Sequence, residues 1–468
     1  MTFTERLVSV VPSQRQLDFQ ELEFYAFVHF TVNTFTGNEW GSGSEDEAIF
    51  NPVLFDANQW IDAIKSAGMK GLILTCKHHD GFCLWPSKVT SHTVENSPFK
   101  RDIVAEVAKA CHENGIRFGV YLSPWDRNAS VYGQGKAYDD FFVAQLTELL
   151  TNYGDVFSVW FDGACGEGPN GKKQYYDWDR YYSVIRSLQP GACINVCGPD
   201  IRWCGNEAGY TREAEWSVVP ARTRDTEKVM ENSQHEDNEE FRQRKIYAWD
   251  GDLGSREILK DESDLVWYPA EVNTSIRPGW FYHDHEDDKV RTLDDLIHVY
   301  YNSVGGNATF LLNVPPMPTG LFHENDVKRL AEIGEYLNDA FSDNIAPDAV
   351  IEADSYKEGG ETDKLLTDSY ETSYFAENET ASLTFSWSEP KNIGHIVIKE
   401  NIKFSQRVER YVVEAKLDGE FCEISKGTVI GHKKIIPLTD VVTDSIRIRF
   451  IETRAQPVIS FIGVYSAK

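Results

Sequence analysis

Asp162 lies at the end of an apolar run, where a buried strand would deliver its carboxylate to an edge. The run Val156–Phe161 is almost continuously apolar, and Gly163 follows the acid. Such a run is typical of a strand in a parallel sheet that is covered on both faces, and in an α/β barrel the groups that do chemistry follow the carboxyl ends of the strands. Asp162 is therefore a candidate catalytic carboxylate. The structural alternative is a helix cap or a turn residue before Gly163.

Polar and aromatic side chains close three other apolar runs in the same way. Candidates at these strand ends are His29, Lys77, His78, His79, Asp80, Tyr121, Trp125 and, next to Asp162, Trp160. Because the carboxyl ends of barrel strands meet at one mouth, we expect these side chains to converge there. Each taken alone has a structural explanation, such as a hydrogen-bonded core histidine or a turn before Gly81.

The histidines raise the question of a metal site. His29, His78, His79 and Asp80 are ligand types that zinc prefers. Adjacent residues on a strand point to opposite faces, so His78 and His79 are not expected to share one ion, and no HExxH spacing occurs. The sequence thus predicts no metal and no cofactor. Neutral imidazoles and tryptophan rings instead suit the hydroxyls and the apolar faces of a sugar.

Composition narrows the classes of partner. The formal net charge is −28, and no basic block interrupts it, which disfavours nucleic acid and anionic membranes. Aromatic residues make up 13% of the chain and include 12 tryptophans, which favours a neutral, sugar-like substrate.

Sugar chemistry at a glycosidic bond needs a second carboxyl group. The glycine-rich segment 198–209 offers Asp200 and Glu207, and the segment 269–273 offers Glu271. A retaining glycosidase holds its two carboxyl groups about 5 to 5.5 Å apart, and apolar or aromatic surroundings raise the pKa of the one that acts as an acid. The residues alone leave Glu207 and Glu271 both open as that acid.

Strand-like runs alternate with amphipathic segments and must position these groups. Strands are predicted at 24–30, 71–76, 117–122, 156–161, 192–197, 265–268 and 308–314, with an eighth near 216–219, and helices at 58–68 and 102–111. This alternation predicts a TIM-like (β/α)8 barrel over about residues 15–340. The polar stretch from about 207 to 264 is expected to form long loops over the barrel mouth.

The character of the chain changes after a predicted helix at 324–341. Short β-rich runs at 397–399, 410–415, 434–438 and 445–451 are separated by turn residues, which is typical of a β-sandwich. We therefore predict two domains, a catalytic barrel over 1–345 and a C-terminal β-sandwich over 346–468.

The eight cysteines form no CxxC pair, and several lie in apolar runs, so we expect them to be reduced. The start of the chain, MTFTERLVSVVPSQ, lacks the pattern of a secretory leader, and no apolar run reaches about 18 residues. A soluble, cytoplasmic protein is expected, although a leader removed beforehand would leave no trace in this sequence.

The chain resembles the α-L-fucosidases of glycoside hydrolase family 29. The motifs that carry the resemblance are FVHF (27–30), NEW (38–40), TCKHHDGFCLW (75–85), GVYLS (119–123) and VWFDG (159–163). The tail resembles a discoidin-like or carbohydrate-binding sandwich through QRVERYVVEA (406–415) and RAQPVI (454–459). The resemblance covers nearly the whole chain and implies fucosylated oligosaccharides or glycoconjugates as partners.

The resemblance also implies roles for single residues. The family is retaining, so Asp162 would be the nucleophile that forms a covalent fucosyl-enzyme. The segment GNEAGYTREAEW (205–216) is similar to the branch that cleaves α-1,3/1,4-fucosyl linkages in Lewis-type glycans, which would make Glu207 the acid/base, with Glu271 as the runner-up. The expected substrate-binding residues are His29, Glu39, Trp40, His78, His79, Tyr121, Trp160, Trp203, Glu271 and Trp280. Trp280 would pack on the fucose methyl group, and Trp203 would stack on the leaving group.

Two other function classes compete with this interpretation. A non-catalytic carbohydrate-binding barrel would keep the aromatic residues but lose a catalytic acid, whereas Asp162 and both candidate glutamates are present. A metal-dependent TIM-barrel hydrolase would need a ligand set that the spacing of the histidines disfavours. Cleavage of a Lewis trisaccharide in the presence of EDTA would separate the glycosidase from both.

Overall fold

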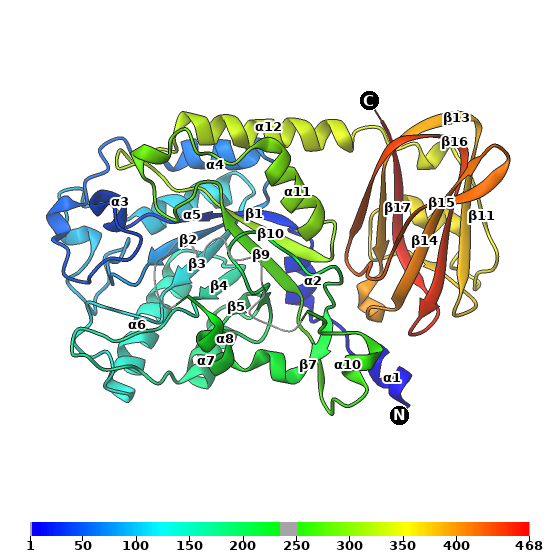
Figure 1. Cartoon of the computed structure of the whole chain (residues 1–468). Helices are drawn as coiled ribbons and strands as arrows, with labels where there is room; N and C mark the ends of the chain where they lie inside the picture. Colours follow the sequence, from blue (N-terminus) through cyan, green and yellow to red (C-terminus); the bar gives the residue numbers. More distant parts are fainter. Residues whose placement is uncertain (1, 235–250, 468) are drawn as a thin grey trace.

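An eight-stranded parallel sheet forms a barrel in the N-terminal part of the chain. The computed structural model describes residues 2–234 and 251–467. Around the sheet the strands follow the order β5-β4-β3-β2-β1-β10-β9-β6, and a parallel bridge between Asn195 and Ile201 brings the two ends of this order together. The strands are β1 (Phe24–Val28), β2 (Gly71–Lys77), β3 (Arg117–Leu122), β4 (Ser158–Phe161), β5 (Cys193–Val196), β6 (Arg202–Trp203), β9 (Ala270–Ser275) and β10 (Ala308–Asn313). The predicted TIM-like barrel is confirmed (Figure 1).

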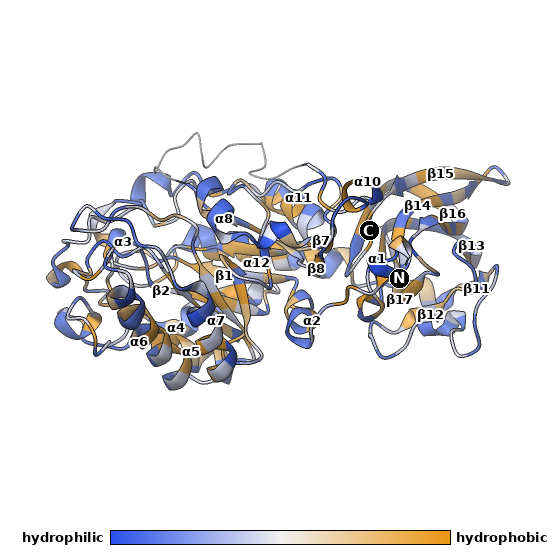
Figure 2. Cartoon of the chain, turned by 90° about the horizontal axis from the view of Figure 1, so that it is seen from below, coloured by the Kyte–Doolittle hydropathy of each residue, from blue (hydrophilic) through white to orange (hydrophobic). Residues whose placement is uncertain are grey.

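Helices surround the strands and carry apolar residues on one face and polar residues on the other, so that both colours appear on them in Figure 2. Asp56 and Asp102 cap the starts of α4 and α5 by accepting from the backbone N–H groups of Asn58 and Ala105. The longer helices are α4 (Ala57–Ser66), α5 (Ile103–Glu113), α6 (Lys136–Asn152), α7 (Trp178–Leu188), α11 (Leu293–Ser303) and α12 (Glu324–Ala340). The short ones are α1 (Phe3–Val8), α2 (Gln14–Gln20), α3 (Asn33–Thr36), α8 (Thr226–Asn232) and α10 (Arg256–Leu259).

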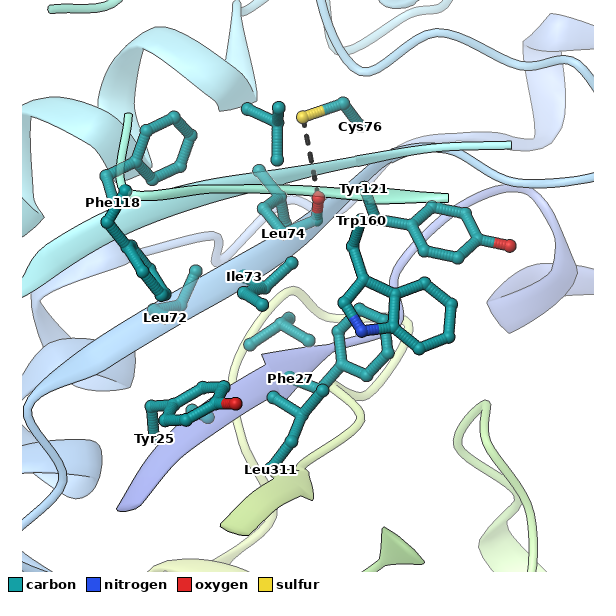
Figure 3. Packing of buried hydrophobic residues seen from close by; sticks show 14 of the residues in the cluster. Tyr25, Phe27, Leu72, Ile73, Leu74, Cys76, Phe118, Tyr121, Trp160 and Leu311 are labelled. Atoms are coloured by element: carbon teal, nitrogen blue, oxygen red, sulfur yellow. Dashed lines mark hydrogen bonds between the residues drawn. The ribbon is translucent and has the colours of Figure 1, made fainter. Parts of the chain in front are cut away.

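Large side chains fill the inside of the barrel. Figure 3 shows Trp160 against Phe27 and Tyr121, with ring centroids 5.1 and 5.4 Å apart. Gly119 makes room on β3, because a Cβ there would lie 3.0 Å from both Ile73 and Phe157. The floor of the barrel mouth is therefore aromatic and rigidly packed.

Two of the predicted strands lie outside the barrel, which corrects the expected strand assignment. The runs 216–219 and 265–268 form β7 (Val218–Pro220) and β8 (Leu265–Trp267), which pair antiparallel with each other. Val218 and Trp267 pack into a small separate core with Leu7 of α1 and Ile402. Their apolar character therefore reflects this side cluster, and β6 and β9 take the two places in the barrel.

The polar stretch 207–264, expected to cover the mouth, is described up to residue 234 and again from 251. The first part of this stretch carries Glu207. Just after α8, Ser233 and Gln234 line a cavity at the barrel mouth. Residues 235–250 lie outside the described part of the chain.

The C-terminal part is an antiparallel sandwich, as predicted. Its strands are β11 (Val350–Ala353), β12 (Tyr374–Phe375), β13 (Ala381–Glu400), β14 (Val408–Leu417), β15 (Glu420–Gly427), β16 (Lys434–Thr453) and β17 (Val458–Ser466). The first half of β13 pairs with β11 and the second half with β17, and the register of β13 against β16 shifts between the two halves, from Ser386 to Lys391. The predicted runs 434–438 and 445–451 are the two ends of β16. Ile345, at the predicted domain boundary, packs in the sandwich core.

No helix in the described ranges combines the length and the apolar character that a membrane crossing requires. All eight cysteines are free thiols, in agreement with the expected reduced state.

Candidate active site

A cavity opens at the carboxyl ends of the barrel strands. It brings together ten of the predicted site residues, from strands and loops far apart in the sequence: His29, Glu39, Trp40, His78, His79, Trp160, Asp162, Trp203, Glu207 and Trp280. Two predicted residues, Tyr121 and Glu271, are not among the lining residues. Lining residues that sequence reasoning did not select are Phe27, Gly163, Ala164, Val196, Ser233, Gln234 and Asn273.

Asp162 follows β4 directly and reaches the cavity with a side chain that is 22% exposed. Its Oδ1 accepts from the backbone N–H of Ala164 at 2.8 Å, and its Oδ2 accepts from the hydroxyl of Tyr121 at 2.9 Å. Burial raises the pKa of Asp162, and these two hydrogen bonds oppose the increase. The result is a fixed, reachable carboxylate, which is the arrangement that a nucleophile needs.

Hydrogen bonds set the tautomers of His29 and His79. The Oδ1 of Asn313 lies 2.8 Å from Nδ1 of His29, so this nitrogen carries the proton. The hydroxyl of Ser123 donates to the carbonyl of Trp125 and therefore accepts from Nδ1 of His79 at 2.7 Å. In both rings Nε2 is left as the acceptor.

Burial keeps all three cavity histidines neutral. Desolvation lowers the pKa of His29 to about 4 and that of His79 to about 3, and it lowers the pKa of His78 well below its usual value. A neutral imidazole can accept from, or donate to, a sugar hydroxyl without introducing a charge.

His78 and His79 both line the cavity, which corrects the expectation that they point to opposite faces. Strand β2 ends at Lys77, and the chain turns at once, so the alternation of a strand does not apply to the two histidines. Their ring centroids are 4.1 Å apart. Asp80 does not join them, because its carboxylate accepts from Phe82 N and from the hydroxyl of Thr31.

The new position of these rings reopens the question of a metal. Within the described ranges one group of side chains could hold an ion, namely His78, His79 and Asp162, whose ligand atoms lie within 4.8 Å of one another. Ligands of tetrahedral zinc at 2.1 Å would be about 3.4 Å apart. The Nε2 of His79 is 3.9 Å from the Oδ2 of Asp162, so the group would have to contract to bind zinc. A sugar hydroxyl between them needs no contraction.

Glu207 lies on a loop after β6 and is held toward the cavity by Trp280. The indole N–H of Trp280 donates to Oε2 of Glu207 at 3.0 Å. Asn206 shapes the turn around the glutamate: its Oδ1 accepts from the backbone N–H groups of Ala208 and Tyr210. Glu207 thus enters the cavity from a loop, whereas Asp162 enters from a barrel strand end.

Glu39 acts on the cavity through Trp280. Its carboxylate accepts from the backbone N–H of Trp280 at 2.7 Å, from Phe281 N at 3.2 Å and from Nε2 of His283 at 2.6 Å. The buried Glu39 therefore fixes the loop that carries Trp280, in addition to lining the cavity itself.

Glu271 lies beneath the cavity floor and is fully buried. Its carboxylate accepts from the hydroxyl of Tyr25 at 2.5 Å, from the indole N–H of Trp160 at 2.6 Å and from Nδ2 of Asn195 at 2.8 Å. Burial raises its pKa to about 7, against the effect of the three donors. Glu271 fixes the Trp160 ring, and that ring stacks on Tyr121, which binds Asp162.

Several residues that hydrogen-bond the site residues were not selected from the sequence. Asn313 and Ser123 stand at strand ends, the same signal that selected His29, so they could have been found. Asn273 accepts from the indole N–H of Trp203 at 2.8 Å. Asp200, the other acid of its loop, is bound instead by Arg15 and Arg186.

A second, more open cavity begins where the first one ends. The two share Glu207 and Trp280, and the second is also lined by Tyr210, Arg291 and Lys289 among other residues. A ligand bound in the first cavity can therefore extend past Glu207 into the second.

A (β/α)8 barrel that holds two carboxyl groups in one cavity with aromatic walls is typical of a class of glycoside hydrolases. The sequence model described as alpha-L-fucosidase matches residues 12–340. The chain belongs to the α-L-fucosidase family and is an α-L-fucosidase by activity.

The similarity extends to the whole chain. Alpha-L-fucosidase 1 of Arabidopsis thaliana is 38% identical over 98% of this chain and 88% of its own length. The crystal structure of a putative alpha-L-fucosidase from Bacteroides ovatus has 42% identity and a TM-score of 0.85 over 100% of this chain and 76% of its own. A Ruminococcus gnavus GH29 fucosidase in complex with fucose has 28% identity and a TM-score of 0.84 over 98% and 95%.

Proposed function

We propose that the enzyme is a retaining, exo-acting α-L-fucosidase in which Asp162 is the nucleophile and Glu207 the acid/base. The observation that carries this proposal is that both carboxyl groups line one cavity, Asp162 from the end of β4 and Glu207 from the loop at the opening shared with the second cavity. Glu271, the alternative acid, is buried under Trp160 and does not line that cavity.

The reaction follows from these positions. In the first step an oxygen of Asp162 attacks the anomeric carbon, the glycosidic bond breaks, and Glu207 gives its proton to the departing oxygen. In the second step Glu207 takes a proton from water, whose oxygen replaces Asp162 and releases fucose. The acceptor Nε2 atoms of His29 and His79 support binding of the sugar hydroxyls.

We further propose that the substrates are α-1,3/1,4-linked fucosides of Lewis-type branched glycans. The loop 205–216 carries the resemblance to this branch, and the second cavity offers space for a leaving group with more than one sugar. Trp203 lines the first cavity, which we call the fucose cavity, and its indole N–H is oriented by Asn273. We propose that its ring is the stacking surface for the leaving group.

Chemical rescue with azide tests both carboxyl roles, because the two variants predict different products. Asp162→Ala should lose at least ten-thousandfold in kcat, and azide, which attacks the substrate directly, should give β-fucosyl azide. Glu207→Ala should lose several orders of magnitude on a trisaccharide but much less on fucosyl fluoride, and azide should give α-fucosyl azide through two inversions.

A matched control is Glu271→Ala, which should lose activity without any azide product. An α-azide from the Glu271 variant, together with none from the Glu207 variant, would move the acid role to Glu271.

A further inference from the structure

The segment that carries Glu207 is fixed from behind by the C-terminal sandwich. The guanidinium of Arg454 lies over the Trp216 ring, 4.3 Å from its centroid, and the Oε1 of Gln406 accepts from the backbone N–H of Ser217 at 2.9 Å. Both Arg454 and Gln406 are fully buried at this contact. Two sandwich side chains therefore hold the chain just after the Glu207 loop.

A third contact holds the same stretch through the barrel residue Asn307. Its Nδ2 donates to the carbonyl of Glu215 at 2.7 Å, and its Oδ1 accepts from the backbone N–H of His432 in the sandwich at 2.7 Å. Asn307 has a φ of +67°, in the left-handed region that asparagine tolerates better than most residues, and its two hydrogen bonds connect the 215–217 stretch to the sandwich.

The Glu215 side chain connects this stretch to the loop itself. Its buried carboxylate binds Arg202 of β6 at 2.6 Å and Arg212 at 3.1 Å. Arg212 in turn donates to the carbonyl of Cys204 at 3.2 Å, which closes the base of the loop over 204–212 on which Glu207 lies. Separating the partners of such a buried pair leaves an uncompensated charge, so the contacts of Glu215 with the two arginines oppose a displacement of either end.

These contacts form a continuous path from the sandwich to the acid. We propose that the sandwich positions Glu207 for proton transfer, with Arg454 and Gln406 as positioning residues; this rests on the proposed role of Glu207 as acid/base. Neither residue lines the substrate cavity. Proton donation requires heavy atoms within hydrogen-bond reach, so a small shift of the loop weakens this step and leaves attack by Asp162 intact.

The proposal predicts that damage to the sandwich contact depends on the leaving group. In full-length Gln406→Leu and Arg454→Met, kcat/KM on a fucosylated trisaccharide should fall tenfold or more. On fucosyl fluoride, whose departure needs little proton donation, the change should stay below threefold. Across aryl fucosides the dependence of the rate on leaving-group acidity should become steeper than in the wild type.

Arg447→Met is the matched control. Arg454 pairs with Glu409 and Arg447 pairs with Glu414, and each arginine lies over an aromatic ring. The ring under Arg447 is Phe421 of the sandwich, at 4.1 Å, and not a residue of the segment that follows Glu207. This variant should keep the wild-type ratio of the two rates. Gln406→Leu removes a single hydrogen bond and keeps the side-chain volume, so it provides the test if Arg454→Met does not fold.

An equal loss on both substrates, or no loss in Gln406→Leu, would overturn the positioning role. A different result would refute the proposed role of Glu207 as the acid/base. If Glu207→Ala itself lost equally on trisaccharide and fluoride, Glu207 would not be the acid. If it lost selectively while the sandwich variants did not, only the positioning role would be wrong.

Discussion

The indole N–H of Trp280 donates to Oε2 of Glu207 at 3.0 Å, and the backbone N–H of the same tryptophan is held by Glu39 at 2.7 Å. One residue therefore connects the proposed acid to the loop after β9. This hydrogen bond reaches the carboxyl group directly, whereas Arg454 and Gln406 contact the chain that follows the Glu207 loop.

We predict that Trp280→Phe, which keeps a ring but removes the donor, lowers kcat/KM on a fucosylated trisaccharide by about tenfold to a hundredfold. A hydrogen bond to a charged group contributes about 1.5 to 3 kcal/mol. Trp203→Phe is the control, since its lost N–H bonds Asn273 and not a carboxyl group. Steady-state kinetics of the two variants side by side would contradict the prediction if the losses were equal.

Which strands enter the barrel was only partly predictable from the sequence. Runs such as 71–76 and 117–122 are apolar because helices cover them outside and aromatic rings inside, and they were assigned correctly. Strand β6 has two residues, Arg202 and Trp203, too few to show any periodicity. Strand β9 directs Glu271 and Asn273 into the barrel, where they support the site. Because these residues are polar, the sequence of β9 did not show the apolar pattern expected of a barrel strand.

The part of the candidate site that follows strand ends, such as His29 and Asp162, was predictable because these residues come directly after strong apolar runs, whereas Glu39, Trp40 and Trp280 were named only through the family resemblance. The assignment of His78 and His79 to opposite faces was wrong, because the argument extended strand alternation past Lys77, where the strand ends. Ser233 and Gln234 came from a polar segment without apolar periodicity, and no local pattern could connect them to the mouth. Such convergence is decided by tertiary packing alone.

A second prediction concerns metal. The cluster of His78, His79 and Asp162 is wider than a zinc tetrahedron, and its imidazoles are suited to hydroxyl groups. We expect no stoichiometric zinc in protein purified without added metal, and unchanged kcat after exhaustive treatment with EDTA. Elemental analysis combined with the activity of the treated enzyme checks this. Activity lost with EDTA and restored by zinc would require the metal-dependent mechanism.

A third prediction follows from the buried Glu271, whose pKa is raised to about 7 in the folded state by burial. A carboxyl group with a raised folded pKa contributes stability that is full below its unfolded pKa of about 4.3 and is lost as pH rises through about 7. The linked change is of the order of 3 kcal/mol between these limits. Glu271→Gln cannot titrate, so the stability of the wild type relative to the variant should fall from pH 4.5 to pH 7.5.

Chemical denaturation of both proteins at several pH values in this window measures the effect. A difference in unfolding free energy that does not change with pH would show that Glu271 stays ionised in the folded protein over this range, as its three hydrogen-bond donors alone would favour.

The last prediction concerns linkage and uses the second cavity as the discriminating element. If its lining receives the sugars on the leaving-group side, Lewis-type α-1,3/1,4-fucosides should be cleaved far faster than α-1,2-fucosyllactose or simple aryl α-fucosides.

Tyr210, which is 37% exposed and lines this cavity without lining the fucose cavity, should then act on branched substrates alone. If a stacking contact between Tyr210 and a sugar is of the size of an aromatic pair, about 0.5 to 1.5 kcal/mol, Tyr210→Ala should lower kcat/KM on a Lewis trisaccharide by about three- to tenfold. The same variant should leave an aryl fucoside unchanged, because its small leaving group does not extend along the cavity. Equal rates of the wild type on all three substrates would refute the branched-glycan specificity. If the wild type is selective but Tyr210→Ala loses equally on the Lewis trisaccharide and on the aryl fucoside, the selecting contact lies elsewhere, at Trp203 in the fucose cavity.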